Sequence, residues 1–248
     1  MTAEPTPEEL LQHPPTPAED AATPITFARV IGPGIAAIRR LWLPFVLLQL
    51  CGAAVVIGYF KVDAVRSACD AIAAVKQRGG FAFSAAAMAF CAGLLPEIFK
   101  FLTGVDRRLD RQRLADTLFV MCLYAVSGSL VDAFYRVLGA TFGNSLNPLI
   151  IAAKVLIDEF IYTPIIGVSI IAIAYAWRRY HYSAARVLRE INARWYLVTV
   201  APLLLPAWAY WIPMTTLMYA LPPSLTFVYG AIASAAIALL LITIVTEK

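Results

Sequence analysis

The stretch 224–245 reads SLTFVYGAIASAAIALLLITIV and contains no charged residue. A helix needs roughly 20 predominantly apolar residues to cross the hydrocarbon core of a bilayer. Five stretches upstream of it are similarly long and mostly apolar, namely 42–60, 81–102, 114–138, 152–177 and 195–220. They are continuous apolar blocks and not the alternating segments of a transmembrane barrel. Because lipid cannot satisfy bare backbone groups, the six stretches predict an all-α, polytopic helical membrane bundle.

The composition of the whole chain supports a membrane protein. Of its 248 residues 60% are hydrophobic and 15% are charged, whereas about a quarter of the residues in a soluble domain are charged. The net charge of +4 comes from short basic loops beside the apolar stretches, which indicates membrane topology and not nucleic-acid binding. The chain has no Walker loop, no nucleotide-binding glycine run and no Cys/His cluster. We therefore expect no enzyme, no metal and no cofactor, and a lipid bilayer and small solutes as partners.

The chain is predicted to have three parts. Residues 1–23 contain five prolines, five acidic residues and no Lys or Arg, which predicts a disordered tail. Residues 24–80 are expected to form surface helices and an additional first span, and 81–248 the main membrane domain. The first of the surface helices is expected to run over 24–41 and to end at Arg39 and Arg40. Over 61–78 apolar residues repeat at helical spacing up to the break at Gly79–Gly80. This segment is either an interfacial amphipathic helix or a surface helix packed on the bundle.

Loop charges predict the orientation of the spans. Two loops are rich in arginine, 103–113 and 178–194, and two spans separate them. Basic loops lie on the cytoplasmic side, so both loops and both termini are expected there. The basic residues Lys61, Arg66, Lys76 and Arg78 would then lie on the opposite side, which leaves open whether 42–60 crosses fully. A bacterial inner membrane is the favoured location, and a mitochondrial inner or peroxisomal membrane is the alternative.

Charged residues inside the apolar stretches are the candidate functional residues. A charge near the bilayer centre costs about 2.5–3.5 kcal/mol on insertion scales, so such residues face the bundle interior, pair or line water. Asp132 and Arg136, and likewise Lys154 and Asp158, are four residues apart and share a helix face; Glu159 follows directly. We expect these residues to form a polar cluster between the third and fourth spans. The cluster would be either a solute path or an ion-pair clamp that sets helix register.

Prolines are the second unusual feature of the spans. Each removes a backbone donor and disturbs the helix around it, and four of them lie in the fourth and fifth spans, at Pro164, Pro202, Pro206 and Pro213. We expect helix kinks at these positions. The kinks would belong either to a flexible, pore-lining helix or to a static one.

Motifs at three places carry a family resemblance. Asp110, Arg111 and Arg113 precede the segment GSLVDAFYR at 128–136, and Lys154, Asp158, Glu159 and Pro164 follow. The pairs Ala201-Pro202 and Ile212-Pro213 come last, and the two prolines are eleven positions apart. In order and spacing this resembles the Mpv-seventeen and peroxisomal-membrane-protein (twenty-two kilodalton) family over residues 81–245. That family has basic residues before Gly-Pro-x-x-His-x-aromatic-Tyr, then Lys-x-x-x-Asp-Gln with a later proline, then two further prolines.

The match is divergent at several motif positions. Ser129 replaces the family proline, Asp132 its histidine and Glu159 its glutamine, while Leu205 and Trp208 stand where Gln and Asn are expected. The resemblance implies an integral membrane protein that forms a weakly selective pore for small solutes. A homo-oligomer is left open.

We therefore predict a small helical channel whose polar path is organised by Asp132, Arg136, Lys154, Asp158 and Glu159. Two alternatives stay open. One is a structural or regulatory membrane protein that does not conduct. The other is a proton-coupled transporter with Asp158 or Glu159 as the carrier acid.

Overall fold

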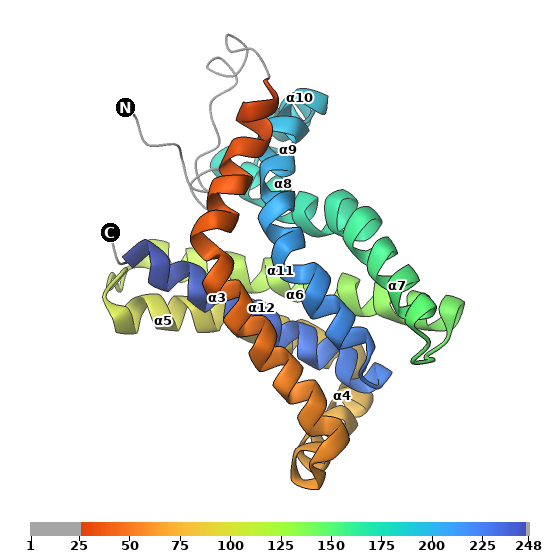
Figure 1. The fold of residues 1–248 in the computed structure, drawn as a ribbon. Coiled ribbons are helices and arrows are strands. Elements are labelled where there is room, and N and C mark those ends of the chain that lie inside the picture. Colours follow the sequence, from red (N-terminus) through yellow and green to blue (C-terminus); the bar gives the residue numbers. More distant parts are fainter. Residues whose placement is uncertain (1–25, 247–248) are drawn as a thin grey trace. The chain divides into compact units, whose positions relative to one another are not determined.

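The fold is entirely helical. The computed structural model describes residues 26–246, so the tail predicted over 1–23 lies outside the described residues. Among residues 26–246 no β-strand occurs (Figure 1). The elements, with three π-helical segments marked η, are α3 (Phe27–Lys61), α4 (Asp63–Met88), η1 (Ala89–Leu94), α5 (Leu95–Thr103), α6 (Arg111–Phe142), α7 (Pro148–Ile157), η2 (Asp158–Gly167), α8 (Val168–Arg179), α9 (Ala184–Glu190), α10 (Ala193–Trp195), η3 (Tyr196–Val200), α11 (Ala201–Tyr219) and α12 (Pro223–Thr246).

Six helical stretches are long and apolar enough to cross a bilayer, and each overlaps one of the six predicted spans. They are Val30–Lys61, Asp63–Thr103, Arg111–Phe142, Pro148–Arg179, Ala193–Tyr219 and Pro223–Ile242. The predicted all-α helical bundle is thereby confirmed, and the chain is a multi-pass integral membrane protein. Most of these stretches extend beyond the apolar blocks, because the flanking polar residues also adopt helical backbone.

Two compact units make up the described chain. Unit 1 contains the described residues up to Phe45 together with Leu156–Ile212. Unit 2 contains Val46–Val155 and the residues from Pro213 onward. The three parts predicted from composition, 1–23, 24–80 and 81–248, stay a prediction.

In unit 2, the continuous run α4–η1–α5 packs against α6 and α12. Met88, Ala92, Phe227 and Ala231 form the buried centre of this packing. Gly128 of α6 lets the two helices approach closely, because a Cβ there would lie 2.5 Å from Met88 Cγ and 2.8 Å from the Ser84 carbonyl oxygen. Small residues at helix crossings are how membrane helices gain van der Waals contact.

The helix α4 bends sharply at Gly80. Its backbone has φ 52° and ψ −131°, a conformation that residues with a side chain rarely adopt. The break predicted at Gly79–Gly80 is therefore present. On the helical part before it, Ala73 and Lys76 are buried while Ile72 and Val75 remain exposed.

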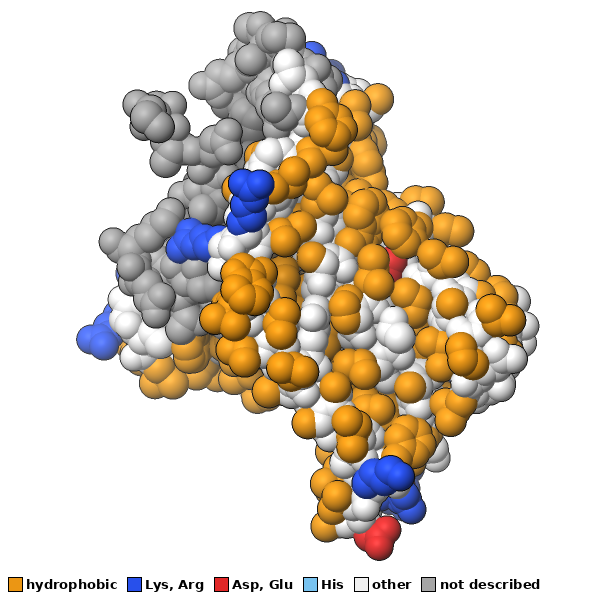
Figure 2. Space-filling model, viewed as in Figure 1, with side chains coloured by type: hydrophobic (Ala, Val, Ile, Leu, Met, Phe, Trp, Pro, Cys, Tyr) orange, Lys and Arg blue, Asp and Glu red, His pale blue; other side chains and the backbone are white. Residues whose placement is uncertain are grey.

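Hydrophobic side chains are spread over the described part of the face drawn in Figure 2. On that face basic and acidic side chains gather at the turn between α3 and α4. The turn contains the exposed residues Lys61, Asp63 and Arg66. Charged residues at a turn between two apolar helices suit a position at the membrane surface.

The first helix differs from the expected division into a surface helix over 24–41 and a span over 42–60. Both belong to α3, which runs without interruption from Phe27 to Lys61. Arg39 and Arg40 suggested an end, but charged side chains do not interrupt backbone hydrogen bonding. Pro44 follows inside the helix, and a proline there removes a single donor. The helix end expected at Arg39 and Arg40 is therefore absent, and the backbone stays helical through both residues.

In unit 1, the segments η2, α8 and η3 pack together. Ala172, Ala176, Trp195 and Val200 form the buried centre of this packing. The segment of α3 in this unit comes close to α11, since a Cβ on Gly34 would lie 2.9 Å from the Pro202 carbonyl oxygen.

Candidate functional site

Asp132 of α6 is the centre of a buried ion-pair cluster in unit 2. Its Oδ2 accepts hydrogen bonds from Lys76 Nζ at 2.8 Å, from Ser84 Oγ at 2.9 Å and from Arg136 Nη2 at 3.2 Å. The side chains of Lys76 and Asp132 are only 6% and 5% exposed. The predicted pairing of Asp132 with Arg136 is therefore present, but the closest partner of Asp132 is a lysine 56 residues earlier.

The bend at Gly80 brings Lys76 and Ser84 to the same carboxylate. Lys76 Nζ also donates to the Gly80 carbonyl oxygen at 3.4 Å, and the single hydroxyl proton of Ser84 is shared between Asp132 and this oxygen, which lies 3.2 Å from Ser84 Oγ. Lys76 and Ser84 lie four residues before and four residues after the bend, one on each helical part of α4. The polar cluster thus surrounds a break in a membrane helix, where the surrounding side chains satisfy a backbone group.

Aromatic rings cover the two cations of the cluster. Lys76 Nζ lies 5.2 Å from the centroid of the Phe227 ring in α12, and Arg136 Cζ lies 4.4 Å from that of Phe81. Cations within about 6 Å of a ring centroid are attracted by its negative face. Whereas Lys76 is enclosed, the side chain of Arg136 is 53% exposed. One carboxylate between two cations leaves the cluster with one excess positive charge.

The cluster lies far along the membrane helix from the arginine-rich loop. Arg111 is the first residue of α6. At the rise of about 1.5 Å per residue, Asp132 lies about 31 Å from it along the helix axis. A hydrocarbon core is about 30 Å thick. With Arg111 at one membrane surface, Asp132 is close to the opposite surface. From there the long Arg136 side chain can reach the headgroup region.

Lys154 of α7 is buried and lies beside an aromatic ring. Its Nζ is 5.6 Å from the centroid of the Tyr219 ring, and both residues belong to unit 2. Asp158 and Glu159 belong to unit 1. The predicted Lys154–Asp158 pair, and the single cluster that would join it to Asp132, stay a prediction.

Asp158 and Glu159 begin η2, a π-helical segment that continues to Gly167. Their exposed fractions are 4% and 1%. Trp208 Nε1 donates to the Glu159 carbonyl oxygen at 2.8 Å, and the ring of Trp208 packs on Phe160 with centroids 5.1 Å apart. π-helical turns are rare and occur frequently at functional sites.

Pro164 lies inside η2 and gives a reason for its wide turns. A proline has no N–H to donate, and in a regular α-helix its ring would clash with the carbonyl four residues earlier. The Pro164 carbonyl oxygen itself accepts from Ser169 Oγ at 2.6 Å and from Tyr196 Oη at 3.0 Å. Side chains of α8 and η3 therefore satisfy a backbone group of the distorted helix.

The other three prolines all lie in α11. Pro202 is the second residue of that helix, directly after η3, and it is fully buried. Pro206 and Pro213 lie further along, and the helix continues through both to Tyr219. The prediction that the helix is flexible at these prolines is not tested by this geometry and stays a prediction.

Sequence reasoning missed Lys76 and Ser84. Lys76 falls outside the apolar repeat of 61–78, and its partner is remote in sequence. One signal was present, since Lys76 and Ser84 flank the Gly79–Gly80 break at equal distances. Within residues 26–246, no group of three or more His, Cys, Asp or Glu side chains is arranged to hold a metal ion.

Comparison with known proteins adds no relative to these observations. No family model matches the chain, and neither a curated protein nor a solved structure does so. The site itself therefore carries the functional argument, and what it establishes is a multi-pass membrane protein with ion-paired and buried acidic side chains in its spanning helices.

Proposed function

We propose that this protein is a weakly selective channel for small solutes, and that the Asp132 cluster lies on the solute path. The observation that carries the proposal is the buried carboxylate of Asp132, held by Lys76 and Arg136 at the break in α4. Intramembrane ionisable groups are costly, and they typically mark ion or substrate pathways. Broken helices in membranes are tolerated where they lie buried in protein or line a cavity.

The charges of the cluster indicate what kind of path it would form. Opposite charges lie side by side, and the excess is a single positive charge. Strong selectivity comes from rings of one sign, so a mixed cluster favours weak discrimination. The place of Asp132 near one membrane surface suits a charged mouth that solutes pass on entry or exit.

A structural clamp is the second candidate. It is favoured by the saturation of Asp132 Oδ2, which accepts from Lys76, Ser84 and Arg136. Such a network can hold α4 against α6 without any solute passing. Breaking a buried ion pair is strongly destabilising even where the pair contributes little net stability.

The test is a current measurement on the purified protein in planar bilayers with a potassium chloride gradient. Asp132→Asn leaves the two cations unbalanced, so we expect the reversal potential to shift toward chloride. Lys76→Met leaves one cation and one carboxylate, so we expect a shift in the opposite direction. Opposite shifts from two neighbouring residues are the signature of a path beside the cluster.

The matched control is Asp63→Asn, because Asp63 is the first residue of α4 and its side chain is 99% exposed. It removes the same charge without touching the cluster, and the reversal potential should stay at the wild-type value. A folded wild-type protein without current over a range of voltage and pH contradicts the channel. Saturable, pH-dependent uptake in proteoliposomes would then identify a transporter, and its absence would leave the clamp.

The resemblance to the Mpv-seventeen family supports the same proposal from the sequence. In the matching segment Asp132 stands where that family has a histidine. Membership of the family stays a prediction, and the proposal depends on the cluster and not on it.

A further inference from the structure

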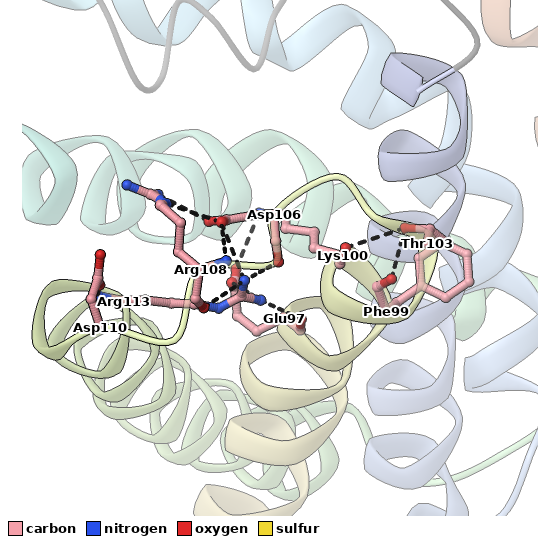
Figure 3. A network of polar contacts seen from close by, with 8 residues as sticks. All are labelled: Glu97, Phe99, Lys100, Thr103, Asp106, Arg108, Asp110 and Arg113. Carbon is pink, nitrogen blue, oxygen red and sulfur yellow. Dashed lines mark hydrogen bonds and ion pairs between the residues drawn. The ribbon is translucent and has the colours of Figure 1, made fainter.

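The loop between α5 and α6, residues 104–110, has a fixed conformation that a single arginine organises (Figure 3). The buried Arg113 guanidinium donates to the carbonyl oxygens of Asp106, Arg108 and Glu97. Gly104 allows the chain to leave α5 with φ 83°. The loop is thereby tied at both ends to the helices it connects.

The acidic side chains of this region are used internally. Asp106 accepts from Arg108 Nε at 3.0 Å and Nη2 at 2.9 Å and also pairs with Arg113 at 3.3 Å. The hydrogen bonds from Arg108 hold the pKa of the Asp106 carboxyl well below its usual range. Asp110 caps α6 by accepting from the Arg113 backbone N–H at 2.7 Å.

Glu97 is engaged in the same way, with Lys100 at 3.1 Å and Arg113 at 4.0 Å. Two arginines remain after this internal pairing. Arg107 and Arg111 are exposed, and neither forms an ion pair within residues 26–246. The loop therefore presents two unneutralised guanidinium groups on a rigid support.

A shallow hollow lies between α5, the start of α6 and the loop residue Leu109, which stands between Arg107 and Arg111 in the sequence. It has a volume of about 210 Å³; Leu94, Ile98, Phe101 and Leu109 form its apolar wall, and the ion-paired Glu97 and Arg113 and the side chain of Thr117 complete the lining. Leu109 is 85% exposed although it belongs to a loop with fixed backbone contacts. A large apolar side chain beside basic residues is typical of segments that lie in the headgroup region.

The position of the loop decides what can occupy this surface. It connects the end of one candidate span, Thr103, to the start of the next, Arg111, so it lies at the membrane surface. Basic residues next to a span are attracted to anionic phospholipids of the leaflet they face. A free anion would match the arginines but not the apolar hollow.

We propose that the α5–α6 loop binds an anionic phospholipid. Arg107 and Arg111 contact the phosphate, and an acyl chain lies in the hollow below Leu109. The inference is independent of the proposed channel, since the loop lies at the other end of α6 from Asp132.

The experiment uses native mass spectrometry of the full-length protein in detergent with added phosphatidylglycerol or phosphatidylcholine. We expect wild type to retain phosphatidylglycerol in preference to phosphatidylcholine. The double variant Arg107→Gln with Arg111→Gln should weaken phosphatidylglycerol binding about thirtyfold, because it removes two basic residues that each attract anionic lipid at the membrane surface. Leu109→Ser should weaken binding of the lipid without changing the response to inorganic phosphate.

The matched control is Arg186→Gln with Arg189→Gln, which removes two exposed arginines from the other basic loop. An equal loss of phosphatidylglycerol in that variant would overturn the proposal in favour of general attraction by net charge. Unchanged binding in the Arg107/Arg111 variant would overturn it directly. Full displacement of the lipid by inorganic phosphate would show a free-anion site in its place.

Discussion

Asp132 shows how one side chain can join three parts of a membrane unit. Its Oδ2 receives donors from both sides of the Gly80 bend and from its own helix. Without the carboxylate, Lys76 would be a buried cation that keeps the Phe227 ring and the Gly80 carbonyl as partners but has no counter-charge from α6 close to it. The cost of losing Asp132 is therefore mainly the cost of stranding Lys76.

This reasoning gives a stability prediction for the pair. Asp132→Leu alone should lower the free energy of unfolding by about 3–5 kcal/mol, because it leaves an uncompensated buried charge. Adding Lys76→Met removes that charge, and most of the loss should be recovered. Chemical unfolding followed by circular dichroism in detergent measures both variants. A double variant as unstable as the single one would contradict the pairing, since it would mean that Asp132 stabilises the fold without Lys76.

At the scale of elements, the close crossing of helices in unit 2 depends on glycines, which have no side chain to hold the helices apart. Gly128 of α6 faces Met88 and Ser84 of α4. Gly93 of η1 faces α6 in the same way, because a Cβ there would lie 3.0 Å from Met121 Cα. The crossing keeps α4 near enough to α6 for Lys76 to reach Asp132.

We expect Gly128→Ala to destabilise the protein by about 1–3 kcal/mol, the range for overpacking a tight core. The added Cβ would meet the Ser84 carbonyl oxygen at 2.8 Å, and a backbone atom cannot move aside cheaply. Gly139→Ala on the same helix is the control, because its Cβ would meet only Asn144 Oδ1 at 3.4 Å. Melting temperatures of the two variants in detergent test this, and equal values would refute a tight crossing at Gly128.

Distorted helices are the other feature of this scale. Breaks or π-turns occur in α4 at Gly80, in η1, in η2 and in η3. In η2 and at Gly80 the carbonyl groups accept side-chain hydrogen bonds, so the irregular backbone is satisfied locally. Buried acidic residues lie beside both distortions, Asp132 at one and Glu159 at the other.

At the scale of the whole molecule, the six spans set the topology. An even number of spans and the two arginine-rich loops predict that both ends of the chain and both loops lie on one side of the membrane. Four basic residues opposed this orientation, at Lys61, Arg66, Lys76 and Arg78. Lys76 is buried against Asp132 and is not an exposed loop charge, whereas Lys61 and Arg66 are exposed, so the orientation stays a prediction.

The orientation is tested by single cysteines in a cysteine-free background. Arg107→Cys and Ser183→Cys should react with a membrane-impermeant maleimide from the same side. Asn144→Cys, in the connection between α6 and α7, should react from the opposite side only. If Arg107→Cys and Asn144→Cys are labelled from one side, α6 does not cross and the six-span topology is wrong.

The sequence by itself determined the class of fold. Continuous apolar blocks require membrane helices, because the helix satisfies its own backbone in lipid. It also identified the Asp132–Arg136 pair, since residues four apart on a helix are neighbours whatever surrounds them. The Gly79–Gly80 break was also predictable from the local sequence, because glycine readily adopts backbone angles that residues with a side chain rarely adopt.

Only the tertiary structure decided which cation neutralises Asp132. Lys76 comes from another helix, and no local rule relates positions 56 residues apart. The continuity of α3 through Arg39 and Arg40 was decided in the same way, because charge marks a preference for the membrane surface and does not end a helix. The spacing of apolar residues along a helix indicates which face of that helix is buried. Which residue of another helix contacts that face depends on how the two helices cross. Here Gly128 and the bend at Gly80 determine how α4 and α6 cross.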